Sequence, residues 1–126
     1  MTSTVERRLE ILELARIHNF LILEGEPSPI LPAGKGGSSR TFLQIDDPYY
    51  YLYFGSAPRP PSYFTLERDQ PEVGRVIRFD SLSKVLSSGM RIGFISAPQP
   101  IIDAVVLHVR RPSLLRRGQI NIIGVH

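Results

Sequence analysis

The sequence has no cysteine, only three histidines and no long apolar run. Without cysteine it can form neither a disulfide framework nor a thiolate metal site, and the histidines lie far apart in sequence. No apolar run approaches the roughly 20 residues that a membrane span needs. The chain opens with polar and charged residues, where a signal peptide would have an apolar core. We therefore expect no metal and no membrane partner, and a cytoplasmic protein, with the mitochondrion as the alternative.

Length and charge allow one domain with a modest core. The chain has 126 residues, of which 42% are hydrophobic, an ordinary fraction for a globular domain. The formal net charge of +3 could suggest a polyanionic partner. Basic residues are spread along the chain, however, apart from a terminal cluster of Arg110, Arg111, Arg116 and Arg117. We interpret that cluster as a solvated face and expect no nucleic-acid partner.

Apolar periodicity predicts an α/β arrangement. Residues 4–19 are typical of an amphipathic helix, because apolar side chains recur there at spacings of three and four. Residues 20–24 (FLILE) form a short apolar run that suits a strand buried on both faces. Further along, residues 74–79 and 91–97 predict strands, and residues 98–110 return to helical spacing. A helix, a buried strand and further strands together indicate an α/β sheet.

Residues 25–45 differ in character from the segments around them. They are rich in proline, glycine and serine and show no sustained period. We predict that they form a disordered insert. The GKGGSS run at 34–39 invites a nucleotide-loop interpretation, which we reject because a phosphate loop needs a preceding strand, a longer glycine spacing and a following helix. Residues 110–126 are interpreted only as a divergent tail.

One segment has an interpretable chemistry, residues 80–94 (DSLSKVLSSGMRIGF). The amine of Lys84 can condense with an aldehyde. Ser81 and Ser83 could donate hydrogen bonds to a phosphate, and Arg91 could bind it through a planar, permanently charged guanidinium. On its own, a lysine between serines is more often a solvated loop residue.

A second candidate group consists of Asp46 and Tyr49, which follow the segment where a buried strand is expected to end. Sheet ends are where α/β proteins build their sites. A carboxylate facing a pyridine nitrogen keeps that ring protonated, so that the ring can accept electrons. The alternative is structural: Asp46 and Asp47 could form a turn before Pro48, and residues 49–54 could be a packed aromatic strand.

Together, DDPYYYLYFG and the later GRVIRFDSLSKVLSSGMRIGF are similar to fold-type-I aminotransferases of class I/II. The similarity is greatest to the fungal aromatic, 2-aminoadipate and kynurenine aminotransferases, and covers roughly residues 5–24 and 46–109. It implies that residues 1–126 are an incomplete large domain that binds pyridoxal phosphate on a mostly parallel sheet flanked by helices. The implied reaction transfers an amino group from an aromatic or dicarboxylic amino acid to a 2-oxo acid, in a homodimer.

The resemblance also implies a role for each candidate residue. Lys84 would hold the cofactor as a Schiff base and act as the general base. Asp46 would pair with the pyridine nitrogen, and Tyr49 with the ring hydroxyl. The phosphate would be bound by Ser81, Ser83 and Arg91.

The chain departs from this family in its insert, its tail and its length. Relatives would read FLILEDDPYYYLYFG without residues 25–45. Residues 25–27 can be encoded with a GTGAG splice donor, and the codons of Ile45 and Asp46 can supply an AG acceptor. We therefore hypothesise that the insert is a translated, unspliced intron. After His108 the similarity fades, and the family's other cofactor and substrate residues have no counterpart.

These departures lead us to expect that the chain by itself does not transaminate. The alternative to a transaminase segment is a non-catalytic, truncated or degenerate aminotransferase-like domain. A third reading, the aminotransferase-like domain of a bacterial transcription regulator, ranks lower because no winged-helix segment precedes these residues.

Overall fold

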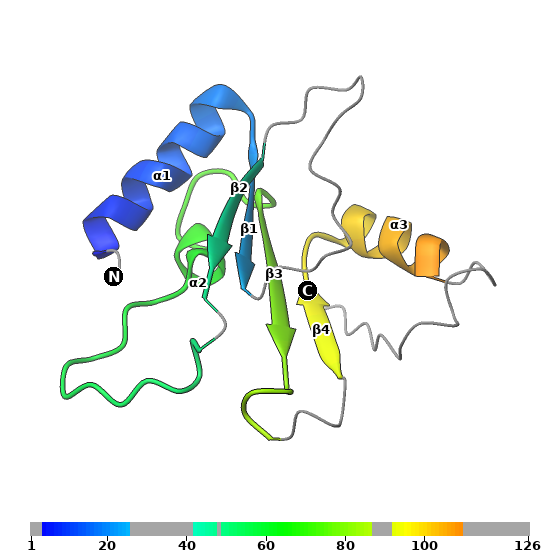
Figure 1. The fold of residues 1–126 in the computed structure, drawn as a ribbon. Coiled ribbons are helices and arrows are strands. Elements are labelled where there is room, and N and C mark those ends of the chain that lie inside the picture. The colour runs from blue at the N-terminus through cyan, green and yellow to red at the C-terminus, as the bar shows by residue number, and fades with distance from the viewer. Residues whose placement is uncertain (1–3, 26–41, 48, 87–91, 110–126) are drawn as a thin grey trace.

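The computed structural model describes residues 4–25, 42–47, 49–86 and 92–109 (Figure 1). Its centre is one mixed sheet with the strand order β2-β1-β3-β4. The four strands are β1 (Leu21–Gly25), β2 (Phe42–Asp46), β3 (Val76–Ser81) and β4 (Gly93–Ser96). β1 runs parallel to both β2 and β3, whereas β4 is antiparallel to β3. The predicted α/β class is confirmed, and two of the three strand pairs are parallel as expected.

Three helices flank the sheet: α1 (Val5–His18), α2 (Tyr63–Glu67) and α3 (Gln99–Val109). α1 begins after Thr4, whose side chain accepts a hydrogen bond from the Arg7 N–H, and ends at Asn19 in the left-handed conformation. Thr4 satisfies one of the N–H groups that the first turn leaves unpaired, and asparagine tolerates the left-handed conformation well. The helices predicted at residues 4–19 and 98–110 are therefore confirmed within a residue at each end.

Both faces of the central strands β1 and β3 are buried. One apolar cluster joins Leu12 and Ala15 of α1 to Tyr63 of α2 and to Ile22 and Val76 of the sheet. The neighbouring strand positions point to the opposite face and form a second cluster with α3, made of Leu23, Ile77, Ile95, Ala97 and Ile102. Figure 1 shows α1 and α2 on one side and α3 on the other. This two-sided burial explains why β1 reads as a continuous apolar run.

The prediction of a disordered insert is wrong at both of its ends. Gly25 is the last residue of β1, and Phe42–Asp46 forms β2, in register with β1 from Leu21↔Phe42 to Gly25↔Asp46. The reason is physical: the edge of β1 has N–H and C=O groups that need partners, and FLQID supplies an apolar, strand-forming segment. The average composition of the insert concealed this short run. Residues 26–41, including the GKGGSS run, lie outside the described part of the chain.

α2 was not predicted from the sequence. Ser62 caps this helix, because its side chain accepts a hydrogen bond from the Thr65 N–H at 3.0 Å. Tyr63 and Glu67 are buried, so the short helix is held by tertiary contacts and not by its own length. The serine directly after Pro60 and Pro61 was the available signal.

The aromatic segment 49–54 is not a packed strand. Within it the residues that the structure describes form a turn and irregular backbone, and Phe54 is 90% exposed. The structural alternative proposed for these aromatics is therefore wrong. Within the described ranges no helix is both long and apolar enough to cross a membrane.

The core can be tested with two isoleucines in different environments. We expect Ile22→Ala to lower the free energy of unfolding by about 2–5 kcal/mol, because Ile22 on β1 is fully buried in the cluster with α1 and α2. The matched control Ile17→Ala, at a side chain that is 59% exposed, should change it by about 0.5 kcal/mol or less. Urea unfolding measures both, and equal losses would contradict the assigned core.

Candidate functional site

The parallel strands bring several predicted site residues to one end of the sheet. Because β1, β2 and β3 run in the same direction, their carboxyl ends lie side by side (Figure 1). Asp46 is the last residue of β2 and Ser81 is the last residue of β3. Gly25 ends β1 between them. Open α/β sheets bind their ligands at the carboxyl ends of their strands.

Lys84 and Tyr49 come together at this end. The Lys84 Nζ lies 5.0 Å from the centroid of the Tyr49 ring, within the range of a cation–π contact. Both side chains are exposed, so the pair is open to a ligand from solvent. The contact joins the two sequence motifs, which are separated by more than thirty positions.

A hydrogen-bonded turn carries Lys84 away from β3. The Ser83 N–H donates to the Ser81 hydroxyl at 3.2 Å, and the Leu82 N–H donates to the Ile92 carbonyl at 3.0 Å. The Leu86 N–H closes the turn on the Leu82 carbonyl at 2.9 Å. Since the Ser81 oxygen accepts the bond from Ser83, its own proton is left to donate to another acceptor. Arg91, the remaining predicted phosphate residue, lies outside the described residues.

Asp46 lies on the edge strand β2 and not on β1, which is the strand next to β3. Its Cα is paired with that of Gly25, and Gly25 is in turn paired with Phe79 of β3. With neighbouring strands about 4.8 Å apart, Asp46 lies roughly 10 Å from β3 across the sheet. Asp46 is exposed. The topology thus places Asp46 at the predicted end of the sheet, but one strand further from the Lys84 turn than a direct continuation of β1 would.

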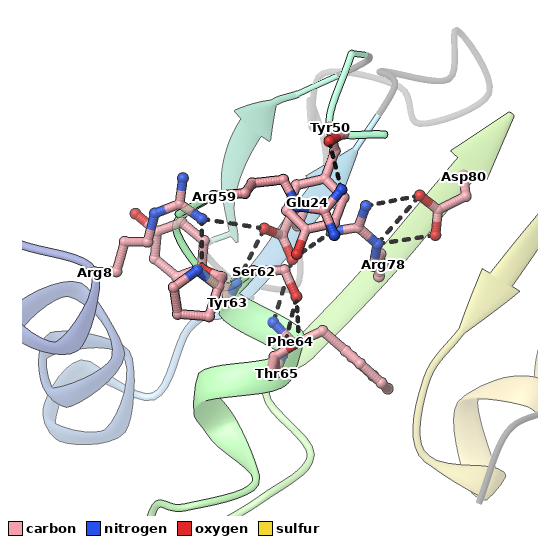
Figure 2. Close-up of polar contacts among 11 residues, drawn as sticks. Arg8, Glu24, Tyr50, Arg59, Ser62, Tyr63, Phe64, Thr65, Arg78 and Asp80 are labelled. Carbon is pink, nitrogen blue, oxygen red and sulfur yellow. Dashed lines mark hydrogen bonds and ion pairs between the residues drawn. The ribbon is translucent and has the colours of Figure 1, made fainter. Parts of the chain in front are cut away.

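The most extensive polar network near the site was not predicted from the sequence. The carboxylate of Glu24 is 1% exposed and lies on β1 directly opposite Arg78 of β3. It accepts hydrogen bonds from the Tyr63 N–H at 3.0 Å and the Phe64 N–H at 3.2 Å, at the start of α2. Its two ion pairs are with Arg78 at 3.2 Å and Arg8 at 3.9 Å. Figure 2 shows these groups converging on Glu24.

Arg78 extends this network toward the site. Its guanidinium makes three hydrogen bonds to the Asp80 carboxylate, at 2.8, 2.9 and 3.1 Å. Burial alone would lower the pKa of Arg78, but the hydrogen bonds and charge of Asp80, with the charge of Glu24, raise that pKa above its ordinary value. Arg78 is therefore permanently charged. Charged residues within the apolar runs FLILE and RVIRFD were the signal that could have revealed the network.

Aromatic rings complete the surroundings of Arg78. The guanidinium carbon lies 4.2 Å from the centroid of the Tyr50 ring, and that of Arg59 lies 3.9 Å from the same ring. Arg59 also donates a hydrogen bond to the Tyr50 carbonyl at 2.9 Å. Burial and the nearby charge of Asp80 raise the pKa of Tyr51, the next residue, so Tyr51 is neutral at physiological pH. No metal-ligating group of three or more acidic or histidine side chains is present among the residues that the structure describes.

No family model matches the chain. Curated proteins that are similar to the chain include several aminotransferases. Bovine mitochondrial kynurenine/alpha-aminoadipate aminotransferase is 44% identical over 107 residues, covering 85% of this chain and 19% of the relative. Aminotransferase tdiD of Emericella nidulans is 44% identical over 107 residues, covering 83% and 20%. An aromatic amino acid aminotransferase of Schizosaccharomyces pombe is 36% identical over 114 residues, covering 79% and 19%.

These matches show that the chain is homologous to a segment of the aminotransferases. More narrowly, it is related to the group that includes the kynurenine/aminoadipate and aromatic enzymes. The resemblance inferred from the two motifs is thereby confirmed. The chain spans about a fifth of the length of the curated relatives it matches.

The network can be tested by removing one charge without changing shape. We expect Glu24→Gln to lower the free energy of unfolding by about 3–5 kcal/mol, because it leaves the buried Arg78 and Arg8 without their shared partner. Chemical denaturation measures the change. The control is Glu13→Gln, which breaks an exposed pair with Arg16 and should have an effect too small to resolve. Equal effects of the two substitutions would show that Glu24 does not hold these elements together.

Proposed function

We propose that this chain supplies part of the pyridoxal-phosphate-binding large domain of a fold-type-I aminotransferase, with Lys84 as the residue that holds the cofactor. The contact of Lys84 with Tyr49 at the carboxyl end of parallel strands is the observation that carries this proposal. It joins residues from the two motifs on which the family resemblance depends. The aminotransferase names of the relatives support the same conclusion.

The described residues fit the chemistry of this cofactor. Lys84 offers an amine for its aldehyde, and Tyr49 a phenol for its ring hydroxyl. Ser81 and Ser83 offer hydroxyl protons for its phosphate, beside a turn whose backbone is already hydrogen-bonded. We propose Asp46 as the partner of the pyridine nitrogen and Arg91 as a further phosphate ligand. When bound, the cofactor supplies an electron sink for the substrate's Cα.

The residues of the chain would then bind the cofactor, orient the Lys84 side chain and move one proton. Lys84 Nζ would take the proton from the substrate's Cα, because it is the only amine placed at this end of the sheet among the described residues. The Tyr49 ring would limit the orientations of the Lys84 side chain through their contact. The serine hydroxyls would hold the phosphate in place, so that the reacting atoms meet repeatedly in one geometry.

The substrates, partners and compartment of the whole protein are also proposals. We propose transfer of an amino group from an aromatic or dicarboxylic amino acid to a 2-oxo acid, in a homodimer. The relatives include proteins named for kynurenine and alpha-aminoadipate and one named for L-tyrosine and 2-oxoglutarate. The proposed compartment is the cytoplasm, and the mitochondrial names of the mammalian relatives support the mitochondrion as the alternative.

We further propose that residues 25–45 separate Asp46 from its place in the site. In the family's pattern Asp46 would follow Glu24 on β1, about 4.8 Å from β3 instead of roughly 10 Å. Gly25 now holds that position with a φ of +119°, and a Cβ built there would lie 1.8 Å from the Phe79 carbonyl oxygen. An aspartate at this position therefore requires a different backbone conformation. The greater separation of Asp46 from β3 supports reduced cofactor binding by the chain with its insert.

The assignment of Lys84 can be tested because the chain has only two lysines, Lys84 and Lys35. We expect borohydride reduction in the presence of pyridoxal phosphate to label Lys84 in preference to Lys35, as mapped by peptide mass spectrometry. Lys84→Arg should abolish the specific adduct, whereas Lys35→Arg should leave it intact. Equal labelling of the two lysines, or of Lys84 and the N-terminal amine, would contradict the proposal.

A further inference from the structure

Arg78 contacts two segments that are distant from it in sequence and one residue of its own strand. It lies on β3, 5% exposed, between the Glu24 carboxylate of β1 and the Asp80 carboxylate of its own strand (Figure 2). The face of its guanidinium packs against the Tyr50 ring at 4.2 Å. A planar guanidinium can serve all three partners at once: it donates hydrogen bonds to Asp80 and forms an ion pair with Glu24, while its face stacks on an aromatic ring.

Two of these partners adjoin the residues of the candidate site. Tyr50 follows Tyr49, and Asp80 precedes Ser81, where the turn to Lys84 begins. Arg78 therefore contacts a side chain next to each of the two segments that carry Tyr49 and Lys84. Arg59 holds the same segment, since it packs on the Tyr50 ring and donates to the Tyr50 carbonyl.

The buried charges explain why this arrangement is fixed in position. Glu24 is held by the N–H groups of Tyr63 and Phe64, so it gives Arg78 a stationary partner on the inner side. Asp80 holds the guanidinium through its Nε and one terminal nitrogen. Rotation of Arg78 away from Tyr50 would break these charge-assisted hydrogen bonds in a buried place, which is costly.

We propose that Arg78 is a positioning residue, which holds Tyr50 and Asp80 so that Tyr49 and Lys84 meet at the carboxyl end of the sheet. For cofactor binding, this role of Arg78 rests on the proposed function. The geometry itself concerns only residues of this chain. It can therefore be tested without the cofactor.

The test measures the reactivity of Lys84 toward a small amine reagent, acetic anhydride, at one fixed pH. Lys35 in the same molecule is the internal reference, and peptide mass spectrometry gives the ratio of the two modifications. The Tyr49 ring beside the Lys84 Nζ covers one side of the amine and restricts the approach of the reagent. We expect Arg78→Lys and Tyr50→Leu to raise the Lys84 to Lys35 ratio by about two- to fivefold, the factor for a cation–π contact at an exposed site.

Two conservative variants separate positioning from general stability. Arg78→Lys keeps the charge but loses the planar stacking and the paired hydrogen bonds. Tyr50→Phe keeps the ring and should leave the ratio unchanged, in contrast to Tyr50→Leu. Circular dichroism and the urea midpoint report whether each variant is folded. If Arg78→Lys does not fold, the comparison of Tyr50→Leu with Tyr50→Phe decides.

An unchanged ratio in folded Arg78→Lys and Tyr50→Leu would overturn the positioning role. So would an equal rise in Tyr50→Phe and Tyr50→Leu, since the ring would then not be the relevant group. Failure of the proposed function has a different result: the unmodified chain would show no preferred pyridoxal adduct at Lys84, while the reactivity ratio still responded to the variants.

Discussion

The buried carboxylate of Glu24 links more parts of the molecule than any other charged group described above. It lies on β1, accepts hydrogen bonds from the first N–H groups of α2, and faces guanidinium groups from α1 and β3. A carboxylate removed from water is costly unless such partners surround it. The fold must therefore bring α1, α2 and β3 to β1 together, and each of these contacts depends on the others being in place.

This constraint also connects the core to the candidate site. Arg78 is held by Glu24 on one side, and it holds Asp80 and the Tyr50 ring on the other. Tyr49 directly precedes Tyr50, and the turn that follows Asp80 carries Lys84. A rigid sheet end with a short, hydrogen-bonded turn is a suitable support for a covalently held cofactor, because a site on ordered elements keeps its geometry better than one on long loops.

Sequence reasoning found what depends on local pattern and missed what depends on register. The strand predicted at residues 20–24 and the helices at both ends follow from apolar spacing, and the structure confirms them. β2 was missed because its short, mostly apolar run before Asp46 follows directly on a proline- and glycine-rich stretch. The pair of Glu24 and Arg78, 54 positions apart, becomes visible only once β1 and β3 are aligned. Lys84 and Tyr49 were predicted as site residues because both lie in motifs that resemble a known family.

We propose that Asp46 and Lys84 belong to one cofactor site, and that residues 25–45 keep Asp46 away from Lys84. The most direct measurement is the affinity for pyridoxal phosphate of the intact chain and of a chain in which Glu24 is joined to Asp46. With both chains shown to be folded by circular dichroism, we predict tighter binding by the joined chain and loss of that gain in its Asp46→Asn variant. Equal or weaker binding by the joined chain would contradict the claim.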